Sequence, residues 1–189
     1  MPVYFVAVRR FGPASGETWR EFIEWSGLTH LREVVSLDTI LCPSVFEGLT
    51  DEDWGHNVQE DFLIGLFHDL DYLLGKLDGH DRANILALMR NPTAAEVGSF
   101  TDPQFEFRGF DLVELQTGVS ALVNCGEFDR AFAATDLSDC GLLTVHAKAS
   151  DVQHLLRTEY PDEPHADCDV WAIWQITDQE LRDEQRPEP

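Results

Sequence analysis

The sequence predicts an α+β fold, with one domain over residues 1–176 built on a mostly antiparallel sheet of five or six strands and two or three packed helices. Strand and helix patterns follow one another without the regular βαβ alternation of a parallel sheet. Hydrophobic residues make up 43% of the 189 residues, with 12 Phe and 5 Trp, so a sizeable core can form. The polar segment 177–189 ends in Pro-Glu-Pro and is expected to be a mobile tail.

The N-terminal part predicts a strand, a helix and a second strand. Residues 3–8 are β-branched and aromatic, which favours an opening strand. The pattern Thr18-Trp-Arg-Glu21 is a capping box and predicts a helix that Gly27 ends. Residues 31–38 predict the second strand.

A long helix is predicted over 61–77. Its apolar positions recur at helical spacing and would form one face. They are Leu63, Leu66, Phe67, Leu70, Leu73, Leu74 and Leu77. His68 and Asp71 fall on the opposite, polar face, three residues apart.

Two strands and a hairpin follow. Residues 84–89 predict a buried strand that Pro92 ends. The segment 105–113 alternates and then changes phase at Gly109, which is typical of a β-bulge. Residues 116–118 predict a hairpin loop leading to a strand over 119–123.

The last elements are a helix and a buried strand. A second capping-box pattern begins at Ser150, and the following apolar positions favour a helix that Pro161 closes. Residues 170–176 are apolar almost throughout and predict a strand covered on both faces.

The charge is the feature that bears most directly on function. The chain has 13 Lys and Arg against 35 Asp and Glu, a formal net charge of −22. Such a field repels nucleic acids and anionic membranes and attracts basic proteins. Only Lys76 and Lys148 are lysines, however, and a GC-rich genome or a salt-adapted source would also give this composition.

The common catalytic signatures are absent from the sequence. It contains no GxGxxG, no GxxxxGK[ST] and no HExxH motif, and 118–122 lacks the final glycine of a nucleophile elbow. Its 4 cysteines are too scattered for a disulfide scaffold, and neither a signal peptide nor an 18-residue apolar run is found. We therefore expect a reduced, cytoplasmic protein rather than an enzyme.

Two places in the sequence favour a different function, a small metal-dependent or cysteine hydrolase. His165 and Cys168 have a spacing used by zinc ligands, and His68 with Asp71 would suit a hard cation. Cys125 could act as a nucleophile with His146 or His165 as its base. No second close ligand pair completes a metal site, so neither metal nor cofactor is expected. A nucleophilic thiol needs positive charge nearby to lower its pKa, and this chain offers mostly negative charge.

Acidic residues surround one tryptophan in Asp51-Glu52-Asp53-Trp54. Aromatic anchors with charged neighbours are typical of protein–protein interfaces, so these residues are the expected partner-binding site. Trp19 and Trp25 lie on the first predicted helix. The alternative is that Trp54 packs into the core while the acids face water.

In size, acidity and lack of catalytic motifs, the chain resembles bacterial immunity and antitoxin proteins. The resemblance implies a small binding protein that covers a basic toxin enzyme. It rests on composition and assigns no residues.

Overall fold

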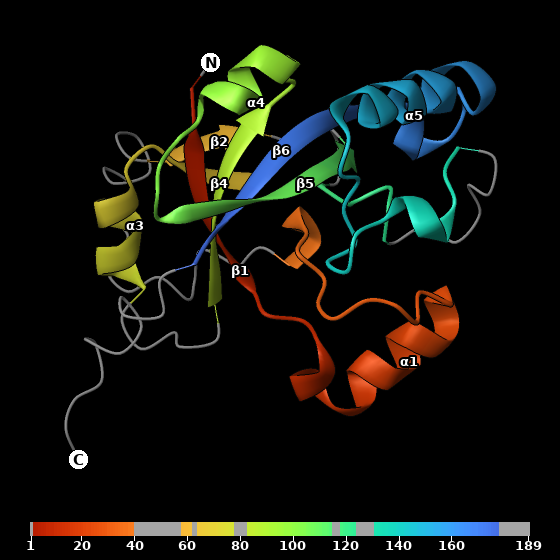
Figure 1. Ribbon diagram of the computed structural model, residues 1–189, viewed down its shortest axis with the longest axis horizontal. Coiled ribbons are helices and arrows are strands. Elements are labelled where there is room, and N and C mark those ends of the chain that lie inside the picture. Colours follow the sequence, from red (N-terminus) through yellow and green to blue (C-terminus); the bar gives the residue numbers. More distant parts are fainter. Residues whose placement is uncertain are drawn as a thin grey trace.

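The computed structural model describes residues 2–39, 58–61, 64–77, 83–114, 118–123 and 131–177 and confirms the α+β class (Figure 1). Six strands form one antiparallel sheet in the order β2-β3-β1-β4-β6-β5. They are β1 Tyr4–Arg9, β2 Val58–Asp61, β3 Ile64–Phe67, β4 Ala83–Arg90, β5 Phe105–Glu114 and β6 Cys168–Ile176. The helices are α1 Glu17–Ser26, α3 Leu70–Lys76, α4 Ala94–Ser99 and α5 His146–Glu159. The 3-10 turns are Pro13–Ser15, Leu37–Thr39, Ala134–Asp136 and Pro164–Ala166.

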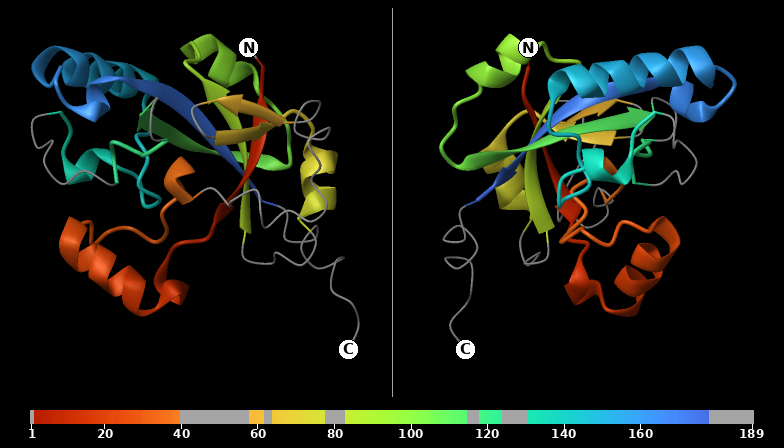
Figure 2. Two further views of the ribbon diagram at one scale, coloured as in Figure 1. Left: turned by 180° about the vertical axis from the view of Figure 1, so that it is seen from behind. Right: turned by 45° about the vertical axis from the view of Figure 1, so that its right-hand side comes forward.

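The two faces of the sheet carry separate cores because side chains alternate along each strand. In β4, Ile85 and Ala87 point to the face that α3 and α5 cover, while Leu86 and Leu88 point to the other. On that second face, the described part of the chain contributes Val35 and Leu37 from one irregular segment and Cys140 and Leu142 from another, but no α-helix. The two views of Figure 2 show the helices α3 and α5 beside the sheet and α1 at the lower end.

The strands predicted at 3–8, 84–89 and 170–176 are confirmed, and so is the bulge. All nine residues of β6 are buried, as expected for a strand covered on both faces. The register between β5 and β6 shifts between Phe107 and Gly109. Gly109 has φ 142°, and a Cβ there would lie 2.7 Å from the carbonyl oxygen of Leu143.

The helix predicted over 61–77 is wrong in its first half. β2 and β3 form a hairpin that pairs Asp61 with Ile64, and α3 begins only at Leu70. Leu66 and Phe67 are both buried, but in the cores of opposite faces. A strand that is buried on both sides can have apolar residues at consecutive positions. Consecutive apolar residues also occur within the apolar face of a helix, so the two structures give the same sequence pattern. The helix begins after Asp69, which is its N-cap: the Oδ1 atom of Asp69 accepts a hydrogen bond from the amide of Tyr72 at 2.7 Å.

Two predicted strands are instead irregular segments. In 31–38, Val34 makes an isolated bridge with Phe11, and a 3-10 turn begins at Leu37. In 119–123, Ser120 makes an isolated bridge with Val113, and a turn follows. The buried apolar side chains that suggested strands are real. The second segment is hydrogen-bonded along the outer edge of β5, with the amide of Ala121 donating to the carbonyl of Leu112 at 2.7 Å, but it is too short and irregular to count as a strand.

Helix boundaries differ from the capping patterns in three places. α1 begins at Glu17 after Gly16, without a side-chain cap, so the predicted box at Thr18 is not used. α5 begins at His146, four residues before Ser150. The capping box that the structure does contain joins Thr93 to Glu96 and starts the short α4, which was not predicted.

Every helix in the described ranges is too short or too polar to cross a lipid bilayer. Of the predicted tail 177–189, residues 178–189 lie outside the described residues, and the amide of Thr177 donates to the carbonyl of Gln104 at 2.9 Å. The limit of the domain at residue 176 stays a prediction.

Replacing Gly109 by alanine should destabilise the fold by about 2 kcal/mol, because the positive φ is strained for alanine and the methyl group meets Leu143. Urea unfolding measures the loss. Gly75→Ala is the matched control, since no atom lies within 4 Å of the place that its added methyl group would take. That helix variant should be neutral or gain up to about 1 kcal/mol. Equal stability of the two variants would contradict a constrained bulge.

Candidate functional site

A fully buried carboxylate, Asp111, joins three segments. Its Oδ2 accepts a hydrogen bond from the hydroxyl of Ser36 at 3.0 Å, and its Oδ1 accepts one from that of Ser120 at 2.5 Å. The amides of Leu112 and Leu37 also donate to it. Asp111 on β5 thus holds both irregular segments that lie against the sheet.

Burial raises the pKa of Asp111 to about 6, although the hydrogen bonds from Ser120, Ser36 and the two amides act in the opposite direction. The side chain is 0% exposed, so a substrate has no route to it. The arrangement of two serines around an aspartate therefore stabilises the fold and does not form a nucleophile site.

A second polar cluster lies at the start of β6, the segment that contains the predicted His165 and Cys168. Asp169 forms an ion pair with Arg90 and accepts from the side-chain amide of Asn91 at 2.8 Å. Asn91, at φ 45°, in turn accepts from the amide of Val170 at 3.1 Å. These bonds fasten the end of β4 to the beginning of β6.

His165 is not paired with Cys168 in this cluster. Its Nδ1 contacts Oε1 of Glu114, the last residue of β5, which is 4% exposed. The carbonyl oxygen of Cys168 accepts from Gln153 at 2.7 Å and from Arg157 at 2.9 Å. The two residues that the sequence brings together thus bind different neighbours, and both sets of contacts connect β6 to surrounding elements.

The thiol of Cys168 does not have the properties of a nucleophile. Burial raises its pKa to about 12, and the side chain is 0% exposed. Cys140 is also buried, with a raised pKa, but its sulfur contacts the hydroxyl of Ser138 at 3.1 Å and the carbonyl of Arg108 at 3.8 Å. Both thiols behave as small apolar side chains.

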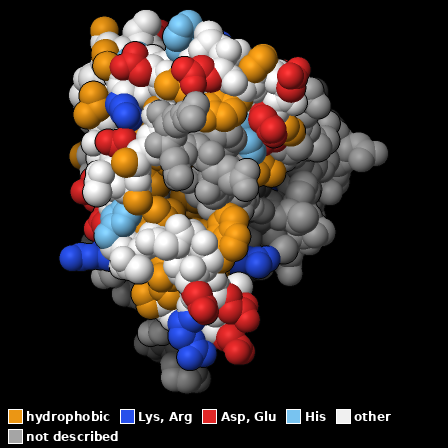
Figure 3. Space-filling view, turned by 90° about the vertical axis from the view of Figure 1, so that its right-hand side faces the viewer, with side chains coloured by type: hydrophobic (Ala, Val, Ile, Leu, Met, Phe, Trp, Pro, Cys, Tyr) orange, Lys and Arg blue, Asp and Glu red, His pale blue; other side chains and the backbone are white. Residues whose placement is uncertain are grey.

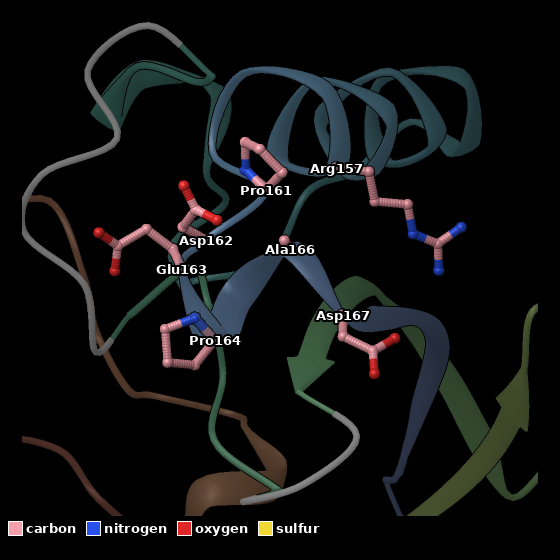
Figure 4. A pocket seen from close by; sticks show the side chains of 7 residues that line it. All are labelled: Arg157, Pro161, Asp162, Glu163, Pro164, Ala166 and Asp167. Carbon is pink, nitrogen blue, oxygen red and sulfur yellow. The ribbon is translucent and has the colours of Figure 1, made fainter.

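A pocket of about 450 Å³ lies beside the same cluster (Figure 4). It is lined by Arg157, Pro161, Asp162, Glu163, Pro164, Ala166 and Asp167. Asp162 and Glu163 lie on one side of it, and Arg157 and Asp167 on the other. Arg157 is moreover already engaged with the carbonyl of Cys168.

The predicted pairing of His68 with Asp71 on one helix is wrong. His68 precedes α3 and is exposed, with its ring 5.4 Å from that of Tyr4. Asp71 lies in the first turn of α3 and is also exposed. Across the described ranges, no three His, Cys, Asp or Glu side chains are grouped closely enough to hold a metal ion.

The predicted partner-binding residues Asp51, Glu52, Asp53 and Trp54 lie outside the described residues, as does Cys125. Their roles stay predictions.

An exposed aromatic that the sequence pattern placed on the first helix, but not in the predicted partner-binding site, lies on α1. Trp25 is 59% exposed, whereas Trp19 on the same helix is 7% exposed. Their rings are connected by Phe22, at 5.8 Å from Trp19 and 6.2 Å from Trp25. The sequence pattern did not predict whether Trp25 is buried, and the packing of α1 shows that it reaches the surface.

The helix that carries this tryptophan is acidic. α1 carries three glutamates, Glu17, Glu21 and Glu24, and one arginine, and all three glutamates are exposed. None of the three forms an ion pair or a side-chain hydrogen bond with another described residue. Figure 3 shows the face that includes α1, with hydrophobic and acidic side chains reaching the surface beside one another in its lower part.

The buried Asp111 should make stability depend on pH. A carboxyl whose pKa is raised in the folded state favours folding when protonated, so its contribution is present below pH 3.8 and is lost as pH rises through about 6. The shift corresponds to about 3 kcal/mol. The unfolding free energy of wild type minus that of Asp111→Asn, measured in urea from pH 3.5 to 7.5, should fall by about this amount. If the difference in unfolding free energy between the two proteins stayed constant across that pH range, the raised pKa of Asp111 would be contradicted.

Cys168→Ser should lower the unfolding midpoint, because the new hydroxyl would be buried without a hydrogen-bond partner, a cost of about 1–3 kcal/mol. Cys140→Ser is the matched control, since Ser138 and the carbonyl of Arg108 are already within reach of that position. Thermal unfolding should therefore show the larger loss for Cys168→Ser. Unchanged stability at position 168 together with a lost activity would instead indicate a functional thiol.

Comparison of the chain with protein-family models, with curated proteins and with solved structures finds no match.

Proposed function

We propose that this chain is a small acidic cytoplasmic protein that binds a basic protein partner, in the manner of an immunity protein or antitoxin. The observation that carries the proposal is the net charge of −22 on 189 residues. A field of this sign accelerates encounter with a basic surface, and it disfavours nucleic acids and anionic membranes.

Internal pairing of the cations supports the proposal. Several basic side chains are engaged in ion pairs within the fold, which leaves many of the more numerous acids unneutralised. The pairs are Arg32–Asp139, Arg90–Asp169, Arg108–Glu33, Lys148–Asp136 and Arg157–Asp169. Each pair offsets a cation against a carboxylate, so the outward field is dominated by the carboxylates that are in excess.

The hydrolase alternative gains no support from the residues that the structure describes. Cys168 is buried with a pKa of about 12, and His165 binds Glu114 instead of the thiol. His68 and Asp71 are both exposed, and only Asp71 lies on α3.

Purification of the tagged chain from its own host at low salt should recover one basic protein at one-to-one stoichiometry, measured by native mass spectrometry. Raising the ionic strength should slow re-association of the two proteins, because screening reduces electrostatic steering.

An unrelated protein of equal length and net charge, purified in the same way, is the control for ion exchange. Recovery of the same mixture of basic proteins at low stoichiometry on both baits would contradict the proposed function.

A further inference from the structure

We propose that the exposed face of α1 is where the basic partner docks, with Trp25 as the apolar anchor and Glu21 and Glu24 as the charged contacts beside it. This inference rests on the proposed function and adds the surface through which it acts.

Trp25 has the properties of an interface anchor. It is 59% exposed, and its ring is supported from below by Phe22, which packs edge-on against Phe11 at 5.3 Å. Phe11 also contacts Trp19 at 5.3 Å, so the row of rings continues into the core. A supported ring loses little conformational freedom on binding, and tryptophan is enriched among the residues that dominate binding energy.

The position of Glu24 favours a cationic partner. It lies in the last turn of α1, which contains no basic residue and ends at Gly27. The helix dipole disfavours negative charge at this end, so Glu24 destabilises the isolated helix. A lysine or arginine from a partner would remove that unfavourable interaction, and Glu21, one turn earlier, would face the same cation.

Charge complementarity selects the occupant of this surface. A second copy of the chain would bring another net charge of −22 toward the same acids, and nucleic acids or anionic membranes would be repelled in the same way. A basic protein is attracted by the acids and can cover Trp25 with an apolar patch. α1 also lies at the lower end of the molecule, away from α4 and α5, where a large partner can approach (Figures 1 and 2).

The experiment measures binding kinetics of the basic protein that is recovered at one-to-one stoichiometry. Trp25→Ala should speed dissociation by about 30-fold, the threshold of a hot-spot residue. Val145→Ala, which truncates a side chain that is 56% exposed elsewhere, should leave the rate unchanged.

The charge test compares two double variants of equal net charge. Glu21→Gln with Glu24→Gln should slow association several-fold and reduce its dependence on salt. Glu159→Gln with Glu163→Gln neutralises two exposed acids near the end of α5 and should have a smaller effect. Equal effects of the two double variants would show that only the total charge matters and would overturn the α1 assignment.

Hydrogen exchange of the wild-type complex gives a readout that does not depend on variants. Slowed exchange over residues 17–27 on binding supports docking at α1. If the partner binds with normal kinetics to every α1 variant and α1 gains no protection, the docking proposal fails while the proposed function stands. If no stoichiometric basic partner is recovered, the proposed function fails and the docking proposal fails with it.

Discussion

The carboxylate of Asp111 is the interaction on which the second face of the sheet depends. Helices cover the first face, whereas segments outside regular secondary structure contribute to the second. These segments are held by backbone hydrogen bonds to β5 and to one another, and in addition by Asp111. Asp111 supplies acceptors to both Ser36 and Ser120 and so fixes these segments against β5. The complete burial of β6 follows, because a central strand can be apolar on both sides only where both faces are covered.

The elements that could be predicted are those with a local signal. The apolar run of β6 and the phase shift at Gly109 are properties of a few consecutive residues. The β2–β3 hairpin could not be separated from a helix, because Leu66 and Phe67 are buried on opposite faces and that pattern also fits one helical face. The Thr93–Glu96 capping box was present in the sequence, yet the short α4 it starts carries too few apolar residues to indicate a helix.

The contacts of the site residues could not be predicted from local sequence either. His165 and Cys168 are close in sequence, but their partners, Glu114 and the side chains of α5, come from distant segments. Only the fold could show that these pairs connect strands and helices rather than assemble a reactive group. The exposure of Trp25 was equally unpredictable, since Phe22 at the preceding helical position is half-buried. The net charge, by contrast, needed no structure, and it is what the proposed function depends on.

The exposure of Trp25 to solvent has a spectroscopic consequence. Among the described tryptophans, Trp19, Trp171 and Trp174 are between 1% and 7% exposed, so Trp25 alone in this part of the chain meets solvent. Its indole should emit at longer wavelength than the others and respond to collisional quenchers. Because Glu21 and Glu24 lie beside it, caesium ions should quench this emission more strongly than iodide ions do. The fluorescence of one side chain thus reports the sign of the local electrostatic potential without any partner.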